Sequence, residues 1–169
     1  MKRPMTPRGY AALRNELMRL KAMRPEIALA IEIARGHGDL SENGDYDAAK
    51  AKSGMTEAKI RDAEARLATA EVIDPSKFGT LTRVVFGASV RIEDIDSGDQ
   101  RFISIFGSEE SDIVKGWISF EAPLGKALIG KEIGDIAKVV LPGGDREYEI
   151  LEISVQYDET VEETTAGKP

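Results

Sequence analysis

The chain has 169 residues, a formal net charge of −7 and no cysteine. This length suits one medium domain or two small ones, and the lack of thiols excludes disulfides and thiolate metal sites. The N-terminal segment lacks the apolar run of a signal peptide, and no segment reaches membrane-spanning length. We therefore expect a folded cytoplasmic protein that makes no membrane contact.

The charge is divided unevenly along the chain. Residues 1–75 hold 13 Lys and Arg against 12 Asp and Glu, whereas residues 76–169 hold 10 against 18. A protein with this acidic balance does not bind bare nucleic acid over its whole surface, because its carboxylates repel the phosphates. Any work near nucleic acid is therefore expected to need a protein partner.

A long helix is predicted from the N-terminal segment onwards. Thr6 can cap it, Pro7 suits its first position, and Met5 can pack on Tyr10. Apolar positions then recur with the alternating spacing of a heptad repeat. The predicted seam positions are Tyr10, Leu13, Leu17, Leu20, Arg24, Ile27, Ile31 and Ala34.

The same spacing returns after a short interval and predicts a second helix that ends near Asp74. Its seam positions are Tyr46, Ala49, Ser53, Thr56, Ile60, Ala63, Leu67 and Ala70. Paired head to tail, the two sets match about one centre, residues 39–42. We therefore predict an antiparallel coiled-coil hairpin over residues 1–75 rather than an intermolecular coiled coil. Arms of about 30 residues would reach roughly 45 Å.

The second half of the chain is predicted to be rich in β-structure. Short apolar runs alternate with turn signals, and the sequence Pro-Gly-Gly-Asp at 142–145 predicts a hairpin between strands at 136–141 and 147–155. One short helix is expected around residues 124–128, which gives an α+β class. The predicted divisions are a linker at 76–82, an α+β domain at 83–157 and a disordered acidic tail at 158–169.

The turn between the two predicted helices, residues 37–47, is acidic, with four carboxylates and no Lys or Arg. Helix capping explains part of this composition, because Asp, Ser and Asn are the usual N-cap residues and Gly38 can end the first arm. Four like charges at the end of an arm also favour a cationic partner. Since Mg²⁺ takes one or two carboxylates and completes its shell with water and phosphate, the loop could complete a site in another molecule.

This loop and several later segments resemble a known family. The run Ala34–Asn43 (ARGHGDLSEN), with Asp45-Tyr46 and Ala48-Ala49-Lys50, is similar to the Gre family of bacterial transcript-cleavage factors, GreA type. The other matching segments are AEVID at 70–74, VFGASV at 85–90, APLGKALIGK at 122–131 and LPGG at 141–144. They occur in the family's order and extend to about residue 155.

The resemblance implies a mechanism that depends on RNA polymerase. The hairpin would enter the secondary channel of a backtracked polymerase and help its active site to hydrolyse the extruded RNA 3′ end. Asp39 and Glu42 would be the catalytic acids and would share a weakly held Mg²⁺ with the polymerase, in two-metal chemistry. No cofactor would be bound by this chain alone. The residues implied to support the loop or contact RNA are Ser41, Asn43, Tyr46, Arg35 and Lys50.

The resemblance also implies an FKBP-like second domain that docks at the channel rim. The candidate docking residues are Ser119, Pro123, Gly125, Lys126 and Lys131. Core packing is the competing explanation for Leu124, Leu128 and Ile129, and a solvated helix face is the competing explanation for Arg35 and Lys50. The chain is then expected to be a monomeric accessory factor and not an enzyme itself.

Two other functions stay open at this level. A non-cleaving relative could occupy the same channel as an inhibitor, although both expected acids are present here. A prolyl isomerase or chaperone is suggested by the FKBP-like domain, but its pocket needs several aromatic side chains that the core also requires. The available aromatic residues are Phe78, Phe86, Phe102, Phe106, Trp117, Phe120, Tyr148 and Tyr157.

Overall fold

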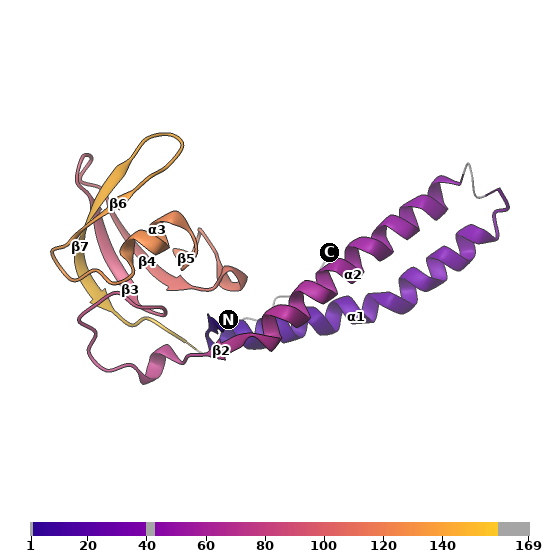
Figure 1. Ribbon diagram of the computed structural model, residues 1–169, viewed down its shortest axis with the longest axis horizontal. Coiled ribbons are helices and arrows are strands. Elements are labelled where there is room, and N and C mark those ends of the chain that lie inside the picture. The colour runs from indigo at the N-terminus through magenta and orange to yellow at the C-terminus, as the bar shows by residue number, and fades with distance from the viewer. Residues whose placement is uncertain (1, 40–42, 159–169) are drawn as a thin grey trace. The chain divides into compact units, whose positions relative to one another are not determined.

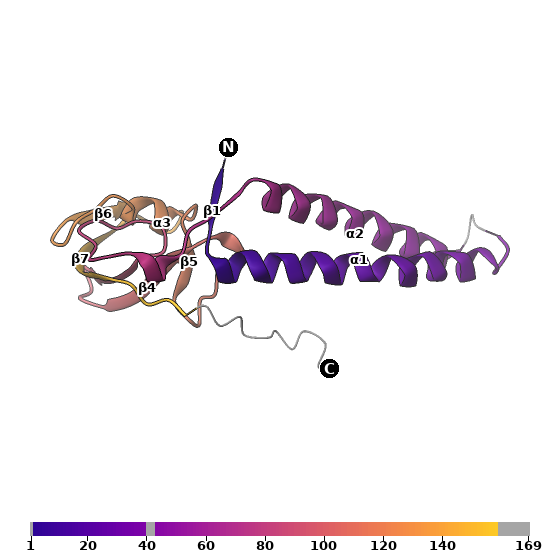
Figure 2. The same cartoon turned by 90° about the horizontal axis from the view of Figure 1, so that it is seen from below.

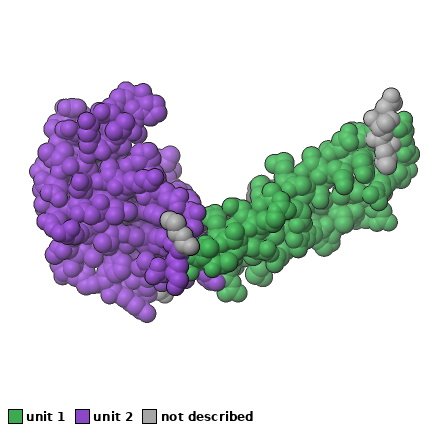
Figure 3. All heavy atoms as spheres, in the orientation of Figure 1, with its two compact units in different colours: residues 1, 11–70 green, residues 2–10, 71–169 purple. Residues whose placement is uncertain are grey.

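The computed structural model describes residues 2–39 and 43–158. They form two compact units, which Figure 3 colours separately. The first contains residues 11–70, and the second contains residues 2–10 together with residues 71–158. The N-terminal segment thus belongs by its contacts to the second unit.

The first unit is an antiparallel helical hairpin, as predicted. Helix α1 (Pro7–Arg35) and helix α2 (Gly44–Ala68) lie side by side and run in opposite directions, as Figures 1 and 2 show. The heptad pattern explains this pairing, because its positions are buried or half-buried between the helices. Of these positions, all of which the structure describes, only Arg24 is exposed.

Ion pairs flank the apolar seam of the hairpin. The Arg24 guanidinium donates to both carboxylate oxygens of Glu57, at 2.8 and 2.9 Å, and Lys21 lies 3.1 Å from Glu64. Exposed pairs contribute little to stability, so the buried seam carries most of the packing energy.

Helix α1 begins where the sequence predicts. The Thr6 hydroxyl accepts a hydrogen bond from the Gly9 backbone N–H at 2.9 Å, which is N-cap geometry. Thr6 itself is fully buried. Pro7 occupies the first helical position, where its missing N–H leaves no hydrogen bond unmade.

Helix α2 ends earlier than predicted. It stops at Ala68, and not near Asp74, because the next residues form strand β2 (Ala70–Val72), which pairs with strand β1 (Arg3–Met5). The Ile73 N–H then donates to the Met5 carbonyl at 2.7 Å. Pairing with a distant segment has overridden the local helical pattern here, as tertiary contacts often do.

The second unit is built on a five-stranded sheet in the order β5-β4-β3-β7-β6. Neighbouring strands are antiparallel, except that β4 and β5 run parallel. The predicted hairpin around residues 142–145 joins β6 and β7. The elements are β3 (Ser89–Asp94), β4 (Gln100–Phe106), β5 (Trp117–Ser119), α3 (Pro123–Leu128), β6 (Ile136–Val139) and β7 (Arg146–Ser154).

The core of the second unit lies on one face of this sheet. Alternate residues of β3 and β6 are buried, which is the period expected when one face of a strand packs and the other meets water. Leu128 of α3 is fully buried in the hydrophobic core that packs on this face, so core packing explains this residue as anticipated. Ile129, the next residue, is 38% exposed.

Two short 3₁₀ helices and irregular segments complete the described chain. They are η1 (Pro75–Lys77), which overlaps the start of the expected linker, and η2 (Ser108–Glu110), which precedes β5. Within the described ranges, no helix is long and apolar enough to cross a membrane. Residues 159–169 of the expected tail lie outside the described residues.

Candidate functional site

The loop between the two helices begins with a tightening of the last turn of α1. The backbone N–H groups of Gly36, His37 and Gly38 donate to the carbonyls of Ile33, Ala34 and Arg35, at 3.1, 3.1 and 3.3 Å. Gly38 then adopts φ of 98°, a left-handed conformation that favours glycine. The helix therefore ends before Gly38, and this glycine turns the chain towards Asp39.

Asn43 closes the loop by bonding to both helices. Its side-chain N–H donates to the Ala34 carbonyl at 2.5 Å, and its side-chain oxygen accepts from the Tyr46 N–H at 3.1 Å. One bond satisfies a carbonyl at the end of α1, and the other caps the start of α2. Asn43 is only 9% exposed, so its contacts favour a supporting role over direct RNA contact.

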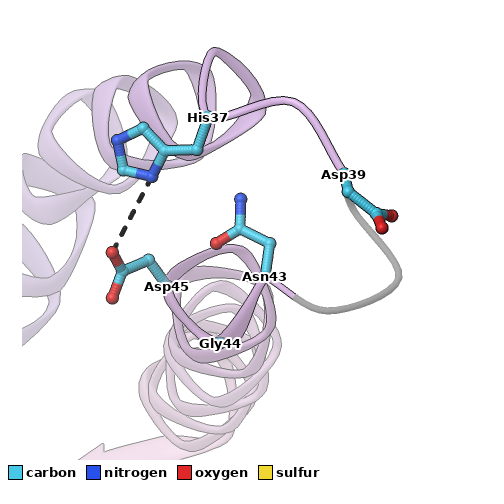
Figure 4. A pocket seen from close by; sticks show the side chains of 5 residues that line it. All are labelled: His37, Asp39, Asn43, Gly44 and Asp45. Atoms are coloured by element: carbon cyan, nitrogen blue, oxygen red, sulfur yellow. Dashed lines mark ion pairs between the residues drawn. The ribbon is translucent and has the colours of Figure 1, made fainter.

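A shallow hollow of about 400 Å³ opens at this end of the hairpin. Its lining residues are His37, Asp39, Asn43, Gly44 and Asp45, which Figure 4 draws as sticks. The His37 Nδ1 atom lies 3.8 Å from a carboxylate oxygen of Asp45, and both side chains are exposed. Figure 4 shows the Asp39 carboxylate directed away from the His37 and Asp45 side chains.

The other predicted loop residues divide into two groups. Asp39, Arg35 and Lys50 are exposed, and Tyr46 is half-buried with its backbone bonded to Asn43. Ser41 and Glu42 lie outside the described residues. Asp39 and Asn43 line the same hollow, while Glu42 retains only the role that the resemblance implies.

The predicted docking residues lie at β5, at α3 and just beyond it. Pro123 and Lys126 are exposed, and Ser119 and Lys131 are half-buried. Gly125 is buried, and a Cβ atom there would collide with the Ser119 carbonyl oxygen. Close packing of α3 on β5 therefore accounts for this glycine, and the exposed surface is formed by its neighbours.

Comparison with known proteins identifies the class. Residues 3–72 match the family model described as "Transcription elongation factor, N-terminal". Residues 79–155 match the one described as "Transcription elongation factor, GreA/GreB, C-term". The chain belongs to the GreA/GreB family of transcription elongation factors, which confirms the family predicted from the loop motif.

Curated relatives extend the match over most of the chain. The transcription elongation factor GreA of Ralstonia nicotianae is 50% identical over 148 residues, which are 87% of this chain and 94% of that protein. GreA of Methylococcus capsulatus is 48% identical over 157 residues, 92% and 98% of the two chains. These relatives favour GreA over the family's paralogues as the counterpart of this chain.

Solved structures give more distant matches. GreA factor homolog 1 of Thermus thermophilus is 26% identical, with 91% of this chain and 99% of that chain covered and a TM-score of 0.43. A GreA/GreB elongation factor of Nitrosomonas europaea is 32% identical, covering 56% and 78%, with a TM-score of 0.39.

Proposed function

We propose that this elongation factor acts on RNA polymerase as an accessory protein and is not itself an enzyme. Its hairpin enters the secondary channel, and its loop assists the polymerase's own cleavage of the 3′ end of backtracked RNA. The observation that carries this proposal is the exposed Asp39, at the end of a helical pair that the Asn43 side chain joins.

The dimensions of the hairpin support delivery of a side chain into a partner. Helix α1 has 29 residues and α2 has 25, so the longer helix extends for roughly 43 Å. A loop that merely joined two helices would not need arms of this length. The arms carry the loop far from its root, where it can enter a narrow opening in a larger protein.

The chemistry of the loop suits a shared Mg²⁺ ion. Asp39 is exposed, and its carboxylate oxygens are hard ligands of the kind that Mg²⁺ prefers. Among the described residues, no group of three or more His, Asp or Glu side chains could hold a metal. Mg²⁺ commonly takes only one or two carboxylates from a protein, with the rest of its shell from water and phosphate.

When bound at the polymerase active site, Mg²⁺ would supply a water molecule of lowered pKa for hydrolysis of the RNA. This chain's part is to present oxygen ligands in a fixed place. Asp39 would do so from its place directly after Gly38, at the end of the helical pair that Asn43 joins, and the resemblance assigns the second acid to Glu42. A positioned carboxylate can also orient the attacking water by accepting its hydrogen bond.

The second unit would dock the factor at the rim of the channel. Pro123 and Lys126 are exposed on α3, and Lys131 follows it, so these residues offer a mixed apolar and basic surface. Basic side chains on an otherwise acidic unit are suited to an acidic partner surface. One factor would bind one polymerase, as a monomer.

The test is the joint replacement of Asp39 and Glu42 by Ala. Addition of the variant to a backtracked polymerase complex with Mg²⁺ is expected to leave the RNA uncut, with a loss of at least about 100-fold in rate, because general acid–base groups typically contribute this much. Binding to polymerase should persist, since the exposed residues of α3 are unchanged.

The control removes the same charge from the same end of the hairpin. Replacement of Asp45 and Asp47 by Ala leaves Asp39 and Glu42 in place and should retain most of the cleavage. Undiminished cleavage by the first variant would exclude the proposed role of the loop acids. A wild-type protein that slows nucleotide addition and never shortens RNA would favour the non-cleaving inhibitor instead.

A further inference from the structure

Arg8 forms a buried ion pair outside the loop. It lies in the first turn of α1, within the second unit, and its Nε donates to a Glu110 carboxylate oxygen at 2.6 Å. The side chains of Arg8 and Glu110 are only 9% and 4% exposed. Removing both charges from water is costly, so a buried pair is weak evidence for stability and calls for another explanation.

Three aromatic rings enclose the Arg8 guanidinium. Its central carbon lies 4.0 Å from the ring centroid of Trp117, 4.8 Å from that of Tyr157 and 5.0 Å from that of Phe106. Phe106 meets both of the other rings edge to face. Desolvated cation–π contacts are directional as well as favourable, so they restrict where the guanidinium can lie.

Backbone contacts hold the same turn from two further directions. The Arg8 backbone N–H donates to the Tyr157 hydroxyl at 3.0 Å, and the Arg8 Nη1 donates to the Asp158 carbonyl at 2.9 Å. The Thr6 hydroxyl donates to Glu110. A Cβ atom on Gly9 would lie 2.7 Å from a Glu110 carboxylate oxygen, so a larger residue here would displace the carboxylate from its present position.

One nitrogen of the cluster remains unsatisfied. In the described part of the chain, the buried Arg8 Nη2 has no hydrogen-bond partner. A cluster selected for stability alone would avoid this cost, since an apolar replacement of similar volume is often as stable. The arrangement instead favours a role in placing the helix, which buried charged groups have in some proteins.

We propose that the Arg8 cage, defined as Arg8, Glu110, Phe106, Trp117 and Tyr157, is a positioning element that fixes the start of α1 to the sheet-bearing unit. Its members other than Arg8 come from β4, η2, β5 and the segment after β7. The cage therefore joins four separate segments to the first turn of α1. Its functional consequence rests on the proposed function, because the helix that it fixes ends at the loop bearing Asp39.

The first experiment needs no polymerase. Because the chain has no cysteine, Glu32→Cys and Val140→Cys create two unique sites for spin labels on exposed positions. Pulsed electron paramagnetic resonance then gives the distribution of distances between the two spin labels. We expect the distribution to become clearly broader after Arg8→Lys or Glu110→Gln than it is in the otherwise unchanged protein.

A matched control is available in the same unit. Arg91 also stacks on an aromatic ring, Phe102 at 5.4 Å, and contacts a carboxylate, Glu152 at 3.4 Å, but it is exposed and makes no cage. Arg91→Lys should leave the distance distribution unchanged. Equal widths for the unchanged protein, Arg8→Lys and Glu110→Gln would overturn the proposal.

The second experiment separates positioning from folding. With backtracked polymerase, Arg8→Lys is expected to lower the maximal cleavage rate several-fold at saturating factor while the half-saturating concentration stays within twofold. A loss of folded protein alone would change the half-saturating concentration and leave the maximal rate intact, which would overturn the proposal. If the unchanged protein stimulates no cleavage, the proposed function fails, and the distance distributions still decide the role of the cage.

Discussion

At the scale of single residues, Asn43 shows why the loop needs an amide and not another acid. Its N–H faces the Ala34 carbonyl, and its oxygen faces the Tyr46 N–H, so both a donor and an acceptor are required. Asp or Ser would cap α2 equally well, since either supplies the acceptor. Only the donor links the loop to α1, and the neighbouring Ala34 is almost fully buried there.

Asn43→Asp tests this requirement with little change of shape. The carboxylate keeps the cap but places a negative charge against the Ala34 carbonyl, so the free energy of unfolding should fall by about 1–3 kcal/mol. Asn43→Ser keeps the cap and introduces no charge, so it should lower the free energy of unfolding by less. Chemical denaturation measures both, and equal stability of Asn43→Asp and the unchanged protein would contradict the role of the donor.

At the scale of elements, the turn after β3 depends on one carboxylate. Asp94 accepts hydrogen bonds from the Arg146 guanidinium at 2.7 Å and from the backbone N–H groups of Asp96 and Ser97 at 2.9 and 3.3 Å. The Arg146 hydrogen bond is the largest cause that lowers the pKa of Asp94, and the backbone bonds add to it against the opposing effect of burial. The pair ties the start of β7 to the end of β3.

A lowered pKa in the folded state has a definite consequence for stability. Asp94 contributes its full share above its unfolded pKa, near 4, and this share is lost as the pH falls through the folded pKa. Arg146→Gln should therefore lower the melting temperature at neutral pH, and the difference from the unchanged protein should shrink below about pH 4. Melting curves across this range provide the measurement, and a pH-independent difference would contradict the assignment.

The elements also show what a single sequence can and cannot predict. The hairpin was predictable because a heptad repeat shows, within one segment, which positions of a helix are buried. The turn at 142–145 was predictable because Pro and Gly restrict or permit particular backbone angles at their own positions. The end of α2 was missed because Ala70–Val72 pairs with Arg3–Met5, a segment distant in sequence that precedes the other helix. Such pairing leaves no periodic signal in either segment.

The same distinction applies to the two functional clusters. Asp39 and Asn43 lie within one short motif, so the resemblance located them together, and the structure describes their geometry. The Arg8 cage combines residues from five places in the chain, and no spacing rule connects them. A signal did exist: Arg8 lies in the first turn of α1, where acids are the usual choice, and Gly9 follows it. A basic side chain at this position is unfavourable for the helix dipole, which indicates an acidic partner elsewhere in the chain.

At the scale of the whole molecule, the proposal assigns docking and chemistry to different surfaces. The exposed residues of α3 belong to the second unit, and the loop acids belong to the first. Binding and catalytic support should therefore respond to different substitutions. Interface mutations generally change how tightly a complex holds, whereas removal of a catalytic group changes the rate within the complex.

Lys126→Glu is expected to raise the half-saturating concentration for cleavage by about tenfold, because reversing a charge at a complementary interface costs on the order of 1–2 kcal/mol, and to leave the maximal rate unchanged. Lys77→Glu, which makes the same charge change at another exposed lysine of this unit, is the control.

The joint Asp39→Ala and Glu42→Ala variant should behave oppositely: in excess it occupies polymerase, contributes no cleavage and suppresses the activity of the unchanged protein. Titration of each variant into a cleavage assay separates the two effects. If Lys126→Glu lowers the maximal rate and the double variant fails to compete, docking and chemistry are not divided between the units as proposed.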